Sequence, residues 1–245
     1  MTPTTHVVLG ATGAVGGALA RRLAAAGAQL VLGGRDAAAL DALARETGGL
    51  PCPGDATTPA AAESAVALAR ERFGRLDGAA NCVGSVLLKP AHLTRDEEFR
   101  EVLATNLWSA FHLLRAAVRA MDGAGGAIVL CSTAAVRTGL ANHEAIAAAK
   151  AGVEGLARSA AATYAPRGIR VNCVAPGLVR SRATARITQN EAALKASVAM
   201  HALGRVGEPE DVAGAIAWLL DPATSWVTGQ VLGVDGGLGS VRTRG

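Results

Sequence analysis

Tyrosine is almost absent from this chain, which has one tyrosine in 245 residues and 3% aromatic residues in all. Half of the residues are nevertheless hydrophobic and 30 are glycine, a composition that favours closely packed helices and tight turns. Uninterrupted apolar stretches of about 18 residues, the length needed to cross a membrane, are missing too. The sequence therefore excludes a membrane span and fits a soluble chain that is long enough to bury a large core.

Concentrated positive charge is also missing. The 24 Lys and Arg residues are scattered, and no basic run is interleaved with aromatic residues, so we expect no nucleic-acid surface. The net charge of +4 instead favours small anionic ligands and a small-molecule substrate.

Cysteines at metal-binding spacing are the third absence. The four cysteines show no CxxC pattern and no histidine at a ligand offset, so we expect no metal site. Residues 1–6 carry neither a charged leader nor an apolar signal core, which predicts a cytoplasmic protein with reduced thiols. Three of the thiols end predicted central strands, where we interpret them as small space-filling side chains: Cys82, Cys131 and Cys173.

Apolar runs and helical segments alternate along the chain. The runs predict strands at residues 5–10, 29–32, 78–81, 127–131, 169–174 and 230–234, with a weaker one at 50–52. Helical periodicity lies between them at 14–26, 37–46, 59–73, 96–121, 142–165 and 209–220. No linker or repeat divides the chain. We therefore expect one α/β domain over residues 1–245, a Rossmann-type doubly wound parallel sheet with helices on both faces.

A glycine-rich turn follows the first predicted strand and opens the first helix. Its glycines, Gly10, Gly13 and Gly16, permit a tight turn and a close approach of the backbone to a pyrophosphate. The N–H groups and the dipole of the helix N-terminus then attract the phosphates. This position in the alternating pattern predicts a dinucleotide-binding site.

The end of the second strand bears on the choice of cofactor. Gly34 stands where an NAD-selective fold usually has a carboxylate, and Arg35 follows it. A guanidinium pairs well with a 2′-phosphate, so we expect NADP(H) to be preferred, with NAD(H) as the alternative. Arg35 also has a simpler interpretation as a solvated residue beside Asp36, the cap of the next helix.

These motifs resemble the short-chain dehydrogenase/reductase family over nearly the whole chain. Asn81-Cys82-Val83-Gly84 is similar to the family's Asn-Asn-Ala-Gly, and residues 203–212 and 234–237 are similar to its C-terminal signature. Together with Arg35, the resemblance implies a set of cofactor-binding residues in the glycine loop and at five later places along the chain: Gly10, Thr12, Gly13, Val15, Gly16, Arg35, Asp55, Ala56, Asn81, Val83, Gly84, Lys150, Pro176, Gly177, Val179 and Ser181.

The resemblance also implies a proton relay of Asn, Ser, Tyr and Lys. Asn106 and Lys150 match two of these positions, and Thr133 falls at the Ser position and keeps a hydroxyl. Four residues before Lys150, where the family carries its proton-donating Tyr, this chain has Ile146. Loss of a general acid typically costs about 10²- to 10⁴-fold in rate, so it weakens hydride transfer without forbidding it. Some dienoyl-CoA reductases of the family also lack this Tyr.

Nearby side chains offer few substitutes. Tyr164 lies 18 residues beyond Ile146 on the same predicted helix, about 27 Å along its axis, and fits a packing role. His143, three residues before Ile146, is a candidate donor, although the helix N-terminus disfavours its charged form. The alternative for His143 is a solvated or capping residue, with Asn142 as the expected N-cap and Glu144 a first-turn residue that the helix dipole stabilises.

We therefore expect an NADP(H)-dependent oxidoreductase acting on a carbonyl/alcohol pair or a polarised C=C or C=N group, with an altered proton relay. The alternative is a nucleotide-binding non-redox enzyme, scaffold or sensor. In relatives a substrate lid occupies the stretch around 181–203, where basic side chains could attract an anionic substrate or simply be solvated. The resemblance further implies a homo-dimer or homo-tetramer built on the two long helices and the last strand. The alanines 147, 151, 157 and 161 would then permit close contact between helices.

Overall fold

Seven parallel strands form the centre of the molecule. The computed structural model describes residues 3–242, in which the sheet order is β3-β2-β1-β4-β5-β6-β7. The strands coincide with the predicted runs to within two residues at each end, because the five central runs are buried on both faces and are therefore apolar throughout. The strands are β1 (Thr5–Leu9), β2 (Gln29–Gly34), β3 (Leu50–Pro53), β4 (Gly78–Asn81), β5 (Gly126–Cys131), β6 (Ile169–Pro176) and β7 (Val231–Val234).

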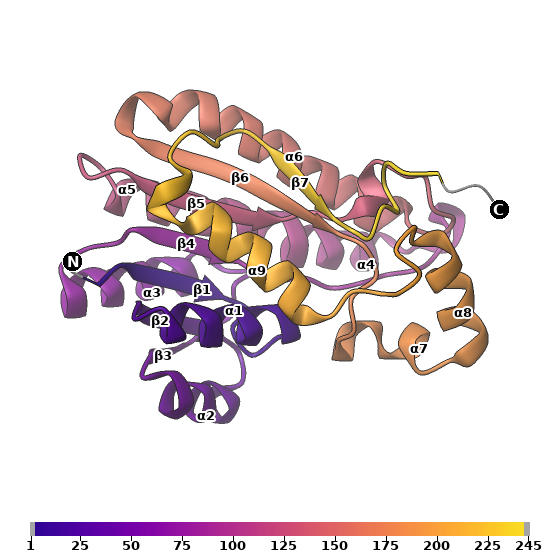
Figure 1. Cartoon of the computed structure of the whole chain (residues 1–245), viewed down its shortest axis with the longest axis horizontal. Coiled ribbons are helices and arrows are strands. Elements are labelled where there is room, and N and C mark those ends of the chain that lie inside the picture. The colour runs from indigo at the N-terminus through magenta and orange to yellow at the C-terminus, as the bar shows by residue number, and fades with distance from the viewer. Residues whose placement is uncertain (1–2, 243–245) are drawn as a thin grey trace.

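Helices cover both faces of the sheet (Figure 1). One layer contains α1 (Ala14–Ala25), α2 (Ala37–Thr47) and α9 (Pro209–Leu220), whose leucines and isoleucines pack on Val8 and Leu32. The other contains α3 (Pro59–Phe73), α5 (Ser109–Ala120) and α6 (Glu144–Tyr164), which pack on Val7, Ile128 and Val171. The shorter α4 (Asp96–Leu103) leads into α5. Two further helices, α7 (Ala185–Thr188) and α8 (Glu191–Met200), lie beyond the carboxyl ends of the strands.

The helix predicted over 96–121 is interrupted. Between α4 and α5 the chain makes a π-helical turn, Ala104–Trp108, with the fully buried Asn106 inside it. The amide of Asn106 donates to the carbonyl of Val102 at 3.0 Å. The wider turn gives Asn106 room to present its other amide atoms to a neighbouring loop, and such turns occur often at functional sites.

The start of α6 also differs from prediction. Asn142 is not the N-cap, because its backbone is left-handed (φ 64°) and its carbonyl accepts a hydrogen bond from the Lys89 N–H at 2.8 Å. His143 occupies the N-cap position, and Glu144 is the first helical residue. Asn tolerates left-handed backbone better than most residues, so the same side chain that suggested a cap forms the turn before it.

Of two expectations about α6, the packing role of Tyr164 is confirmed and the exposed alanine face is not. Tyr164 packs against the core on the α6 side of the sheet, as predicted. The alanines do not share one exposed face, because Ala157 and Ala161 are buried in the chain's own core while Ala151 is exposed. Within residues 3–242 no helix combines the length and apolarity needed to cross a bilayer.

Candidate active site

A cavity of about 620 Å³ opens at the carboxyl ends of β1, β2, β4, β5 and β6. The order of strands reverses between β1 and β4, and ligands of open α/β sheets bind in the crevice outside such a switch point. Thr184 at the N-cap of α7, Ile187 of α7, and Ser197 and Met200 of α8 close the opposite side of the cavity.

The glycine loop forms one end of the cavity. Gly10 has φ 77°, and a Cβ built on it would lie 2.7 Å from the carbonyl carbon of Cys82. A Cβ on Gly16 would collide with the carbonyl oxygen of Gly10, so side chains at these two positions are excluded. Gly13 starts α1 with no side-chain cap, and the first turn holds no acidic residue. This N-terminus is therefore left for an anion, and the loop fits the pyrophosphate of a dinucleotide.

Arg35 lies exposed on the rim of the same end, just past β2. No hydrogen bond or ion pair holds its guanidinium within residues 3–242. Asp36 caps α2, as predicted, by accepting the Ala39 N–H at 3.0 Å. Asp55 faces the cavity, and the N–H of Thr57 at 3.0 Å, aided by the charge of Arg35, lowers the pKa of its carboxyl group.

Two of the predicted cofactor residues, Gly16 and Asn81, do not line the cavity but support residues that do. Gly16 supports the loop by its lack of a side chain. The amide of Asn81 is buried, donates to the Ser109 hydroxyl at 3.0 Å and accepts the Val83 N–H at 3.2 Å. Both residues are absent from the cavity lining, whereas the other predicted cofactor residues face it.

Lys150 projects from α6 into the centre of the site. It is 6% exposed, which excludes an ordinary surface lysine, and its ammonium donates to the carbonyl of Cys131 at 2.8 Å. Burial lowers the pKa of this amine. A Cβ built on Gly84 would lie 3.7 Å from the lysine Nζ and 3.3 Å from the Asn106 Oδ1, so the glycine leaves room for both groups.

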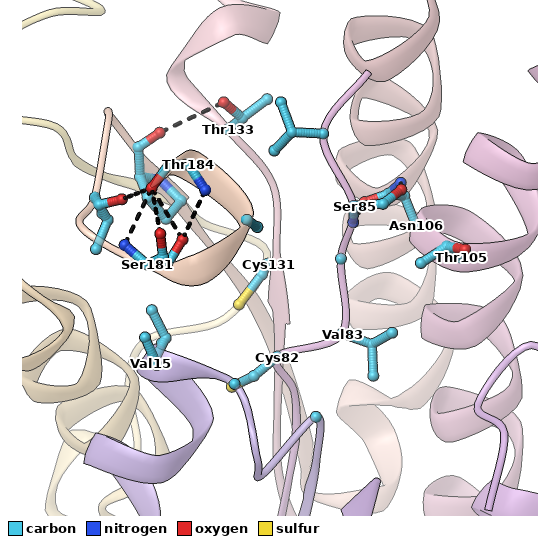
Figure 2. Close-up of a pocket in the computed structure, with 18 of the residues that line it drawn as sticks. Val15, Cys82, Val83, Ser85, Thr105, Asn106, Cys131, Thr133, Ser181 and Thr184 are labelled. Atoms are coloured by element: carbon cyan, nitrogen blue, oxygen red, sulfur yellow. Dashed lines mark hydrogen bonds between the residues drawn. The ribbon is translucent and has the colours of Figure 1, made fainter. Parts of the chain in front are cut away.

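Asn106 and Thr133 lie on opposite sides of the cavity (Figure 2). The amide of Asn106 donates to the Ser85 hydroxyl at 3.0 Å and accepts the Ser85 N–H at 3.2 Å. Thr133 follows β5, and its hydroxyl accepts the Ala135 N–H at 3.3 Å and donates to the Pro176 carbonyl at 3.5 Å. The structure therefore brings Asn106, Thr133 and Lys150 together around one space.

Ile146 occupies the wall of that space one turn before Lys150. It is 5% exposed and packs in a small apolar cluster with Val102, Ala149 and Leu87. His143 lines the cavity nearby, and its Nδ1 lies 2.8 Å from the Ala141 carbonyl. A carbonyl can only accept, so this contact places a proton on Nδ1 and leaves Nε2 for another partner.

Comparisons with known proteins agree with this geometry. Residues 10–239 match the model of the enoyl-(acyl carrier protein) reductase family. The chain belongs to the short-chain dehydrogenase/reductase family. An uncharacterised oxidoreductase of Mycobacterium tuberculosis strain H37Rv is 38% identical over 94% of this chain and 89% of its own. The galactitol 2-dehydrogenase (L-tagatose-forming) of Cereibacter sphaeroides is 37% identical over 94% and 92%.

A solved structure gives the same result for the fold. The short-chain type dehydrogenase/reductase from Mycobacterium ulcerans superposes with a TM-score of 0.92 at 31% identity, covering 96% of this chain and 89% of that one. Members of this family use NAD(P)(H). The α/β fold with a seven-stranded parallel sheet flanked by helices is thus confirmed.

Several lining residues of this family member were missed by sequence reasoning. His201, buried at the end of α8, donates from Nδ1 to the Ser197 carbonyl at 2.7 Å and accepts the Leu178 N–H at 3.2 Å. It thereby ties α8 to the loop after β6. Ser85 was also missed, although it directly follows the Asn-Cys-Val-Gly motif and was therefore within reach. His201 has no such local signal.

Proposed function

We propose that this chain is an NADP(H)-dependent oxidoreductase with an altered proton relay. Its substrate is a small molecule with a carbonyl/alcohol pair or a polarised C=C or C=N group. One observation carries the proposal: Lys150, Asn106 and Thr133 surround a cavity that the glycine loop also lines, while Ile146 supplies an apolar wall in their midst.

The cofactor preference rests on Arg35. This exposed residue directly follows the end of β2, where Gly34 leaves no carboxylate to accept a ribose hydroxyl. Paired charge-assisted hydrogen bonds from Arg to a 2′-phosphate favour NADP(H) over NAD(H). When bound, the dinucleotide supplies or accepts a hydride at its nicotinamide.

The remaining residues each have a place in substrate handling. The Thr133 hydroxyl can donate to a substrate oxygen, since its present partner at 3.5 Å is weak. Lys150 places a cation beside the same space, and Asn106 orders the Ser85 loop that borders it. Ile146 has no proton to give. Ketone reduction needs a proton on the developing alkoxide, so a polarised C=N or C=C bond is better suited to this site.

His143 is the candidate replacement for the proton donor. It is half-buried, lines the cavity, and sits one turn before Ile146 at the start of α6. With Nδ1 bound to Ala141, its Nε2 is the atom that would exchange a proton with the substrate. Because Nδ1 keeps its proton on the Ala141 carbonyl, Nε2 carries a proton to donate only when the ring is doubly protonated.

A substrate panel tests the proposal. Purified protein is mixed with NADPH or NADH and with ketones, imines and enoyl thioesters, and the loss of reduced cofactor is followed by absorbance. We expect turnover of at least one class with NADPH and loss of that turnover in Lys150→Met. No oxidation above background with any class would refute the redox function.

Ile146→Tyr separates this proposal from the second candidate, a nucleotide-binding scaffold or sensor. The apolar packing of Ile146 is the observation that favours that candidate, because it removes the usual acid. If the wild type is inert and the tyrosine variant reduces ketones, the wild-type protein is the nucleotide-binding scaffold or sensor. An active wild type whose variant is slower would show that Ile146 serves a different reduction. Ile146→Phe is the matched control, since it adds the ring without the hydroxyl.

The surroundings of the site suggest two further roles. Residues 181–203 would act as the substrate lid, with Arg182 at the cavity and Arg180 in an ion pair with Glu208 at 3.1 Å.

Exposed Trp108 and Phe111 on the α5 side and Trp226 before β7 mark surfaces for a homo-dimer or homo-tetramer. Cytoplasmic location remains the expectation and would be checked by cell fractionation.

A further inference from the structure

Cys82 and Cys131 form a pair of neighbouring thiols in the floor of the cavity. The strands β4 and β5 are parallel partners, and their ladder ends with Asn81 opposite Leu130. Cys82, the residue after β4, and Cys131, the last residue of β5, come next in this register. Parallel neighbours have Cα atoms about 4.8 Å apart, within the range of about 4.4–6.8 Å that a disulfide spans.

The two side chains also point the same way. Figure 2 shows both sulfurs turned toward the side on which Val15 lies. Both residues pack against the core on the α1 and α9 side of the sheet, and both are partly exposed and line the cavity. The thiols are therefore reachable from the cavity. Cys173, by contrast, is buried, and Cys52 lines the cavity without a thiol partner.

The chemical surroundings distinguish the two sulfurs. The neighbouring thiol of Cys82 and the ammonium of Lys150 lower the pKa of Cys131, against the effect of burial. The same contact and burial raise the pKa of Cys82. A thiolate is the nucleophilic form of cysteine, so Cys131 is the sulfur suited to attack and Cys82 the one suited to follow.

We propose that Cys82 and Cys131 form a peroxide-sensitive dithiol site that closes the cofactor cavity when it is oxidised. The Cys131 thiolate attacks one oxygen of hydrogen peroxide, the O–O bond breaks, and hydroxide leaves, which gives a sulfenic acid. The Cys82 thiol then attacks the Cys131 sulfur, the S–S bond forms, and water leaves. In sum, two thiols give two electrons to peroxide, and the products are one disulfide and two waters.

The contacts of these residues explain why the bond would impair binding. The backbone of Cys82 lies so close to Gly10 that a Cβ there would be 2.7 Å from the Cys82 carbonyl carbon. The carbonyl of Cys131 holds the ammonium of Lys150 at 2.8 Å. Drawing the two sulfurs together therefore moves the supports of the phosphate loop and of Lys150. The effect on NADPH binding rests on the proposed function, whereas bond formation does not.

The test combines thiol counting with peptide mapping after treatment with hydrogen peroxide. The four cysteines fall in four different tryptic peptides, so mass spectrometry identifies each pairing. We expect the thiol count to fall from four to two, with one Cys82–Cys131 cross-link within a single chain that dithiothreitol reverses. Cys82→Ser and Cys131→Ser should each form no such link, while the control Cys52→Ser should form it as the wild type does.

NADPH titration reads out the consequence. Oxidised wild type should bind at least tenfold more weakly than reduced protein, and bound NADPH should slow cross-linking. Four intact thiols, or a link that involves Cys52 or Cys173 instead, would overturn the dithiol site. An unchanged affinity after cross-linking would overturn closure. If peroxide forms the cross-link but the protein binds no NADPH even before oxidation, the proposed function would be refuted and the dithiol site would stand.

Discussion

His6 should make the protein unstable in mild acid. This residue is 3% exposed near the start of β1, with Nε2 2.9 Å from the Thr4 hydroxyl and with Nδ1 lacking a hydrogen-bond partner among the described residues. Burial lowers its pKa from 6.5 to about 4, although the charge of Asp77 opposes the shift. The unfolded chain therefore binds a proton as the pH falls below 6.5, while the folded chain stays neutral until about pH 4.

The size of this effect follows from linkage. Stability falls as the pH is lowered wherever the unfolded state holds more protons than the folded state. With pKa values of 6.5 and about 4, the loss between pH 7 and pH 5 is about 2 kcal/mol from this one ring. At an m-value of about 3 kcal/mol/M, the urea midpoint would fall by about 0.7 M.

His6→Phe keeps a ring in the same place and removes the titration. Urea unfolding of both proteins would be followed by tryptophan fluorescence at pH 7 and pH 5, at one protein concentration because association adds to stability. The wild-type midpoint should fall by about 0.7 M more than that of the variant. Carboxylates such as Glu98 and Asp211, whose pKa values lie near 2, contribute below this window. Parallel losses in the two proteins would refute the argument.

Four further predictions concern the site and its surfaces. Arg35→Ala should weaken NADPH binding by about tenfold or more and leave NADH binding unchanged; equal losses for both would refute the cofactor preference. Gly16→Ala should abolish binding of both dinucleotides while the circular dichroism spectrum stays the same, because the new methyl group meets the Gly10 carbonyl. His143→Gln should lower kcat about 100-fold if the ring donates the proton, and a change below twofold would exclude that role. Light scattering should show a dimer or tetramer that Trp226→Glu weakens, and a wild-type monomer would contradict the exposed surfaces.

Much of the fold was accessible from the sequence because its signals are local. A strand buried on both faces must be apolar throughout, and an amphipathic helix must repeat its apolar face, so both patterns survive in a single sequence. The glycine loop was equally accessible, since the absence of side chains at Gly10 and Gly16 is itself the structural requirement. The matches at Thr133 and Lys150 depended on resemblance, because nothing local distinguishes them.

The features that were missed arise from contacts between distant segments. The apolar pattern over 96–121 continues through the π-helical turn, because one wide turn hardly alters which residues face the core. Asn142 looks like a cap by composition and is placed in a left-handed turn by its contact with Lys89. The pairing of Cys82 with Cys131 depends on the register of two strands separated by 44 residues of chain, which no local pattern contains.

The replacement at position 146 concerns the proton and leaves the charged parts of the site in place. Lys150, Arg35 and the open N-terminus of α1 all remain where an anionic cofactor would need them. A chain that had lost its chemistry entirely would have no need to keep Lys150 buried, because an ammonium held by one carbonyl and no carboxylate is costly away from water. The burial of this costly group beside the apolar Ile146 supports the proposed reaction, in which the substrate needs less help with its proton, over the alternative of a scaffold or sensor.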